Sequence, residues 1–167
     1  MRGLVRCIRT LFCVAIVGLG VSPAEAIDGF RFGMTSIQLR SLRGTAWSQA
    51  ESVQDKKLAM GRMEGLRTTT IEGYELRYAV LLKKNKAHRV TFATVGPARP
   101  ALPYSEFQNL MQHLKAYCIS LSPKLKLEDA VAFVPTEPHP IGDNYLRQIS
   151  IAAGDNSCNF YLRFQRE

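Results

Sequence analysis

The segment that decides the fold class is YELRYAVLLKKNKAHRVTFATV, residues 74–95, because it has the pattern of a β-hairpin. Its first part carries apolar residues at every second position, namely Tyr74, Leu76, Tyr78, Val80 and Leu82. Such alternation is typical of a strand with one buried face. The polar residues 83–87 predict a turn, and residues 89–95 predict the partner strand, with Val90 and Phe92 on one face.

A helix is expected after this hairpin. Residues 96–103 contain three prolines and predict an extended linker. Beyond them, apolar residues recur at spacings of three and four: Phe107, Leu110, Met111, Leu114, Tyr117, Cys118 and Leu121. Ser105 and Gln108 predict a capping box at the start of the helix, and Pro123 follows its end. The pattern places Cys118 on the buried face.

Three strand candidates complete the chain, at residues 130–134, 145–152 and 158–165. In the last one, Cys158 shares a face with alternate apolar residues, so it also points into the core. We therefore expect an α+β fold, with two helices packed on one face of an antiparallel meandering sheet. Residues 27–167 form one domain, in which 27–95 and 104–167 are candidates for two similar halves.

The first helix of this fold is expected near residue 36. Residues 30–32 predict a short extended segment and Gly33 a turn, while Thr35 and Gln38 have the spacing of a capping box. Gly44 stands where a helix would end. Residues 46–66 show only a weak pattern.

Residues 1–26 have the three parts of a secretory signal peptide: a basic start, an apolar run over residues 11–21, and the small-residue end Ala24-Glu25-Ala26. The apolar run is too short for a membrane-spanning helix, which needs about 20 residues. We expect cleavage near Ala26, no membrane span in the mature chain, and a periplasmic or secreted location.

Two of the four cysteines lie in the predicted signal peptide, which leaves Cys118 and Cys158. An even pair in an oxidising compartment indicates one structural disulfide. Closing a loop of this length contributes about 3–4 kcal/mol in the chain-entropy model. The sequence therefore predicts a bridge from the second helix to the last strand.

The formal net charge of the chain is +8, which favours anionic partners. An exported location suggests a lipid headgroup, an acidic glycan or another envelope protein. We expect no nucleic acid as partner, because the chain is expected outside the cytoplasm and no recognition motif is present. A charge that serves only solubility explains the same composition. Both interpretations stay open at this point.

The candidate anion contact is a basic segment at the expected hairpin turn, with Lys83, Lys84, Lys86 and Arg89. Arg89 suits bidentate binding of a carboxylate or phosphate, and lysines act as point charges. The simpler alternative is a solvated turn whose lysines discourage edge-to-edge aggregation. A further candidate surface is the sheet face that would carry Arg77, Tyr161 and Arg163, because arginine and aromatic residues are enriched in interfaces.

Motifs for catalysis, cofactor binding or metal binding are not found in the sequence. His88, His113 and His139 lack metal-ligand spacing, and we expect His113 on the surface. Acidic residues such as Glu72 and Glu75 are interpreted as solvated charges unless a cleft perturbs them. We therefore expect no catalytic residue, no cofactor and no metal.

The string Phe32-Gly33-Met34-Thr35, leading into a helix with Gln38, resembles the start of small exported bacterial domains. These are the BamE-like outer-membrane assembly lipoproteins, the β-lactamase-inhibitor-protein-like domains and uncharacterised exported relatives. The resemblance covers about a dozen residues, and this chain has no lipoprotein cysteine at the expected cleavage point. It implies a helix packed on an antiparallel sheet in a non-enzymatic binding domain of the cell envelope.

The leading hypothesis is a non-enzymatic exported binding protein of the bacterial cell envelope, which contacts an anionic component or another exported protein. The alternative is an enzyme, or an inhibitor of an enzyme, that acts on envelope polymers. A pocket with converging carboxylates and a histidine favours an enzyme. A protruding loop at residues 135–143 without a pocket favours an inhibitor.

Overall fold

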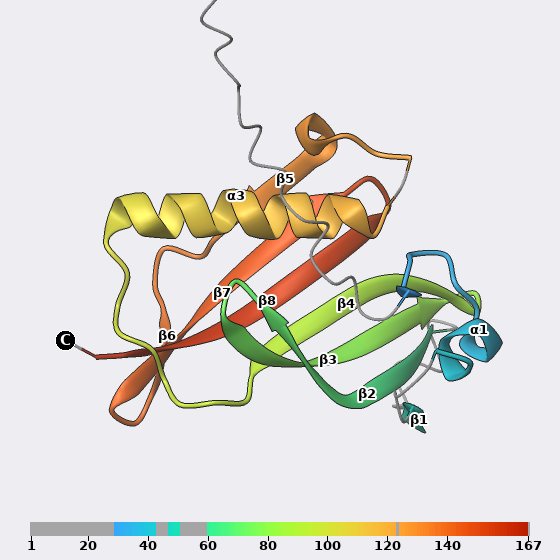
Figure 1. Ribbon diagram of the computed structural model, residues 1–167, viewed down its shortest axis with the longest axis horizontal. Helices are drawn as coiled ribbons and strands as arrows, with labels where there is room; N and C mark the ends of the chain where they lie inside the picture. Colours follow the sequence, from blue (N-terminus) through green and yellow to red (C-terminus); the bar gives the residue numbers. More distant parts are fainter. Residues whose placement is uncertain (1–28, 43–46, 51–59, 123, 167) are drawn as a thin grey trace, which may run out of the picture.

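The computed structural model describes residues 29–42, 47–50, 60–122 and 124–166 of the chain. Within these residues, two α-helices, α1 (Ser36–Arg40) and α3 (Tyr104–Ser120), and the short 3-10 helix η2 (Leu127–Asp129) accompany one sheet (Figure 1). Its strands are β1 (Trp47–Ala50), β2 (Met60–Ile71), β3 (Tyr74–Lys83), β4 (Lys86–Thr94), β5 (Ala130–Phe133), β6 (His139–Ile141), β7 (Asn144–Ala153) and β8 (Asn156–Gln165). The predicted α+β class is therefore confirmed.

The strand order across the sheet is β1-β2-β3-β4-β8-β7-β5, and β6 pairs with β7. Neighbouring strands are antiparallel, with one exception: β4 and β8 are parallel, with Val90 opposite Cys158 and Phe92 opposite Phe160. The prediction of a purely antiparallel meander was therefore wrong at the centre of the sheet. Parallel neighbours need a long crossover, and here the chain leaves β4, passes through α3 to β5 at the far edge, and returns through β7 to β8.

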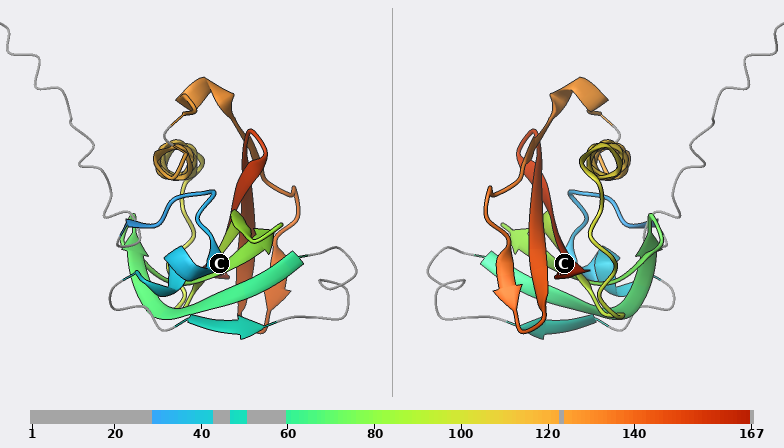
Figure 2. Two further views of the ribbon diagram at one scale, coloured as in Figure 1. Left: turned by 90° about the vertical axis from the view of Figure 1, so that its right-hand side faces the viewer. Right: turned by 90° about the vertical axis from the view of Figure 1, so that its left-hand side faces the viewer.

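One face of the sheet is covered by α3, and Figure 2 shows both helices on that side. The buried row under α3 runs across four strands, from Tyr78 through Phe92 and Phe160 to Ile149. The rings of Phe92 and Phe160 stack with centroids 4.8 Å apart, and Tyr117 of α3 meets Phe92 edge-on at 5.7 Å. The period-two pattern of the strands and the helical stripe of α3 thus form one hydrophobic core.

The predicted β3–β4 hairpin is confirmed, and its turn is tighter than expected. Only Lys84 and Asn85 lie between the strands, with φ values of 50° and 56°. Positive φ at both central residues is the mark of a type I′ turn, whose twist matches that of paired strands. Asn85 also accepts a hydrogen bond from the backbone N–H of Ser36 at 3.3 Å, so α1 begins against this turn.

The predicted capping box of α1 is present: Gln38 N–H donates to the Thr35 hydroxyl, and the Gln38 side chain accepts from Thr35 N–H. The extended segment expected at residues 30–32 is not a strand. Instead, the backbone joins the β3–β4 hairpin one step later, where Gly33 N–H donates to Ala87 O and Ala87 N–H donates to Met34 O. Phe30 is buried in the core, which explains why its segment looked like half a strand.

Three further expectations were incomplete or wrong. The capping box expected for α3 is absent, because the helix begins two residues earlier, with Pro103 rather than Ser105 as N-cap, and the Gln108 side chain donates to the Tyr104 hydroxyl instead. Strand β2 falls partly in the weakly patterned region; it contains two glycines and a register shift between Glu64 and Thr68, which obscure its alternation. The 135–143 loop does not simply protrude, since β6 pairs with β7. The signal peptide and Gly44 lie outside the described residues.

Neither described helix has the length and apolar character needed to cross a membrane.

Candidate functional site

A cleft of about 400 Å³ lies between α3, the β2–β3 turn and the linker that follows β4. Its walls combine polar and apolar side chains: Glu72, Tyr74, Arg99, Pro100, Ala101, Leu102, Glu106, Asn109, Leu110 and His113. Pockets that bind small molecules are mainly apolar, with a few convergent polar groups, and begin at about 300 Å³. The cleft therefore has the size and the mixed lining of a small-ligand site.

The β2–β3 turn forms one wall of the cleft in an unusual conformation. Glu72 and Gly73 have φ values of 50° and 74°, again a pair of left-handed residues. For glutamate this conformation costs about 1–2 kcal/mol. At Gly73 a Cβ atom would also lie 3.3 Å from Nη1 of Arg99, so the turn leaves room for the arginine.

Arg99 is held from several directions. Its Nη1 donates to the backbone carbonyl of Glu72 at 3.4 Å, and its Cζ lies 4.6 Å from the centroid of the Tyr74 ring. Its backbone pairs with β8, because Arg99 N–H donates to Arg163 O and Gln165 N–H donates to Arg99 O. Burial raises the pKa of Tyr74, and the nearby charge of Arg99 opposes that shift. The guanidinium is thus fixed over a buried, protonated phenol.

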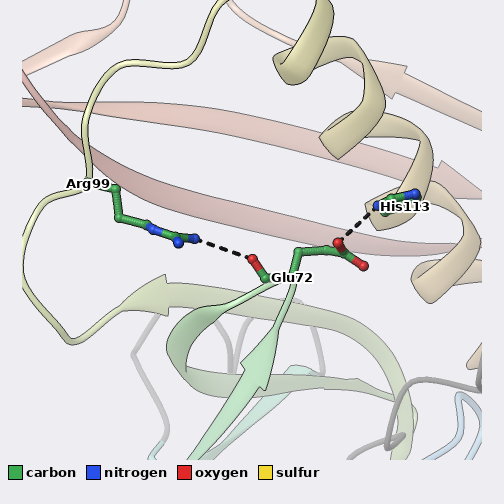
Figure 3. A network of polar contacts seen from close by, with 3 residues as sticks. All are labelled: Glu72, Arg99 and His113. Atoms are coloured by element: carbon green, nitrogen blue, oxygen red, sulfur yellow. Dashed lines mark hydrogen bonds and ion pairs between the residues drawn. The ribbon is translucent and has the colours of Figure 1, made fainter.

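His113 contacts Glu72 on the side opposite Arg99. Its Nδ1 lies 2.9 Å from Oε2 of Glu72, and Figure 3 shows Glu72 between the two, with its carbonyl toward Arg99 and its carboxylate toward His113. The side chains of His113 and Glu72 are 53% and 40% exposed. A carboxylate on Nδ1 orients the ring and leaves Nε2 for another partner.

Sequence reasoning placed these residues on the surface and did not bring them together. Glu72 and His113 are 41 positions apart, and neither belongs to a recognisable motif. A weak signal was present in α3, where Glu106, Leu110 and His113 share one helical face across the spacing i, i+4, i+7. The sequence did not show that the β2–β3 turn lies opposite this face of α3.

The face of the sheet opposite α3 is a second candidate surface. Arg77, Ala93, Tyr161 and Gln148 stand in one register row across β3, β4, β8 and β7. The next row contains Thr91, Asn159 and Ser150, and Arg163 lies further along β8 on the same face. The strand registers thus place Arg77, Tyr161 and Arg163 on one face, which is the grouping that the sequence indicated. Neither α1 nor α3 lies on this side (Figure 2).

The basic segment divides into two parts. Lys83, Lys84 and Lys86 are exposed at the end of the hairpin. Arg89 lies beside β8, where its Nε donates to the Ser157 hydroxyl at 3.0 Å. Burial, followed by the charges of Lys83 and Arg89, lowers the pKa of His88. Arg89 thus connects the positive end of the hairpin with the polar face of the sheet.

Cys118 and Cys158 are both fully buried, as their patterns predict, and meet between α3 and β8. They are free thiols in this structure. Burial, reinforced by a hydrogen bond that the Cys158 thiol donates to Cys118, raises the pKa of Cys158 well above its usual range. The disulfide itself stays a prediction.

Within the part of the chain that the structure describes, no three His, Cys, Asp or Glu side chains are grouped so that they could hold a metal ion.

Comparison with known proteins gives no relative: no family model, no curated protein and no solved structure matches this chain.

Proposed function

We propose that this chain is an exported, non-catalytic binding protein of the bacterial cell envelope, which holds an anionic partner on the sheet face opposite α3. The observation that carries the proposal is the register row of Arg77, Ala93, Tyr161 and Gln148 on that face. Extended polar rows suit a polymer that lies across several strands. An acidic glycan fits this description best, and an acidic surface of another exported protein is the other partner considered.

The chemistry of the row explains the preference for anions. Arginine offers a planar array of five N–H donors that matches a carboxylate. Tyr161 provides a flat apolar ring, and the amides of Gln148 and, in the next row, Asn159 add donors and acceptors for hydroxyl groups. Arg89 and the hairpin lysines extend the positive charge toward one end of the sheet. After removal of residues 1–26, which carry three arginines and one glutamate, the chain keeps a net charge of +6 of its original +8, and this charge adds attraction at long range.

The test is binding of the protein to an immobilised polyuronate, compared with a neutral glucan. Wild type should bind the polyuronate, and this binding should weaken as the salt concentration rises, because exposed charges are screened over about 8 Å at physiological ionic strength. Arg77→Gln should weaken this binding about tenfold, as expected for loss of one charge-assisted contact. A neutral glucan that binds equally well, or an Arg77→Gln variant that binds like wild type, would contradict the proposal.

The predicted export and the resemblance to BamE-like domains support the envelope location in this proposal. Expression of the full chain with its N-terminus intact tests the first: the protein recovered from the periplasm or medium should begin at Ile27. A cytoplasmic product that retains residues 1–26 would remove the envelope from the proposal and leave the sheet face to be tested by itself.

A second candidate function, an enzyme acting on envelope polymers, is favoured by the contact between Glu72 and His113. A histidine oriented through Nδ1 by a carboxylate can act as a general base through Nε2. Against this, both side chains are about half exposed, so water competes for the site. Turnover of an envelope polymer that His113→Gln abolishes would favour the enzyme; equal products from wild type and variant would reject it.

A further inference from the structure

We propose that the cleft between α3 and the β2–β3 turn is a binding site for a small zwitterion, a free amino acid. The site is separate from the sheet face used in the proposed function. Cationic and anionic groups line the same cleft of about 400 Å³, together with apolar side chains. A ligand that carries a carboxylate, an ammonium group and an apolar side chain can satisfy all three.

The carboxylate of the ligand is assigned to Arg99. The contacts with Glu72 O and Tyr74 fix the guanidinium but engage only part of its donors. Because the backbone of Arg99 is also paired with β8, little ordering is needed when a ligand binds. Gly73 also contributes, because a Cβ atom at this position would lie only 3.3 Å from Nη1 of Arg99.

The ammonium group is assigned to the opposite side of the cleft. There Glu106 and Asn109 project from α3 near His113, and Glu72 contributes its carboxylate from the turn. Figure 3 shows Arg99 and His113 on opposite sides of Glu72, so the positive guanidinium and the helix wall face the ligand from two directions. An ammonium group beside Glu106 would be a charge-assisted donor.

The apolar part of the lining selects the side chain. Leu102 and Leu110, with Pro100, form the nonpolar part of the wall. An adjoining hollow of about 210 Å³ shares Leu102 and is lined by Tyr104, Phe107, Tyr145, Arg147 and Phe164. A ligand with an aliphatic side chain of leucine size therefore has apolar surface available in either direction.

The test is a titration of the protein, followed by backbone amide NMR, with three probes of similar shape: L-leucine, 4-methylpentanoate and 3-methylbutylamine. L-leucine should bind with a dissociation constant on the order of 1 mM, as expected for so small a ligand. Saturable shifts should cluster at residues 99–102 and 109–113. The acid, which lacks the amine, and the amine, which lacks the acid, should each bind at least tenfold more weakly.

Variants assign the two ends of the ligand. Arg99→Gln should weaken L-leucine at least tenfold, and Glu106→Gln, a change at an exposed side chain that leaves the fold intact, should weaken it at least threefold. Arg77→Gln on the opposite sheet face should leave L-leucine binding unchanged while it weakens polyuronate, which separates this site from the proposed function. No binding of L-leucine by wild type, equal binding of the one-ended probes, or an unchanged Glu106→Gln variant would overturn the inference.

Discussion

At the scale of single residues, the conformation of the β2–β3 turn beside the cleft depends on Gly73. Gly73 has a φ of 74°, and a Cβ there would approach Arg99 Nη1 to 3.3 Å. Gly73→Ala should therefore lower the free energy of unfolding by about 1–2 kcal/mol, the cost of a left-handed alanine. Urea denaturation measures this.

The matched control for that substitution is Gly61→Ala in β2, where a Cβ would meet only Leu82 at an ordinary 3.8 Å. Its stability should stay equal or rise by up to about 1 kcal/mol, because alanine restricts the unfolded chain. Equal losses at both positions would show that the conformation of the turn is not the cause.

We expect His88 to make the stability of the protein depend on pH. Its pKa is lowered from the usual 6.5 by burial and then by Lys83 and Arg89, while Asp155 opposes the shift. The unfolded chain therefore binds the proton more readily than the folded chain, so stability rises with pH through this window and falls as pH drops below about 6.5. Urea midpoints at about pH 7.5 and 5.5 should differ less for His88→Gln than for wild type. An identical pH dependence would exclude His88 as the source.

At the scale of elements, the β3–β4 hairpin joins a structural role to a functional one. Its turn anchors α1 through Asn85, while Lys83, Lys84 and Lys86 point into solvent. Replacing the three lysines with glutamine should change the free energy of unfolding by less than about 0.5 kcal/mol per site, as is usual for exposed positions. Binding to polyuronate should weaken, and its salt dependence should become shallower.

A control variant with the same change in charge replaces Lys124, Lys126 and Arg166 with glutamine, all of them exposed. If the hairpin is a specific contact, this control should bind polyuronate more strongly than the hairpin variant. Equal weakening by the two variants would mean that only net charge matters, as the solubility interpretation holds.

At the scale of the whole molecule, two thiols from distant parts of the chain meet in the core. Cys118 on α3 and Cys158 on β8 are both 0% exposed. Protein recovered under oxidising conditions should carry a disulfide between them, which would link the helix layer to the centre of the sheet. Quantitative thiol labelling after denaturation without reductant should find no free thiol. Two labels per chain would contradict the bridge.

The elements of this fold with a strong local signal were determined by the sequence alone. Alternation predicted β3, β4, β7 and β8, helical spacing predicted α3, and side-chain caps predicted the start of α1. These patterns depend on contacts between near neighbours and on one buried face. Where the local signal was weak, as in β2 with its glycines and register shift, no strand was predicted.

Only the tertiary structure decided how the strands are ordered and what lies in the cleft. The parallel pairing of β4 with β8 follows from the path of the chain over the sheet, which no local pattern encodes. That pairing brings Arg77 and Tyr161 into one row. The cleft depends on contacts between residues far apart in sequence, such as Glu72 with His113. Burial and charge act on neighbours in space, so these sites exist only once the layers have packed.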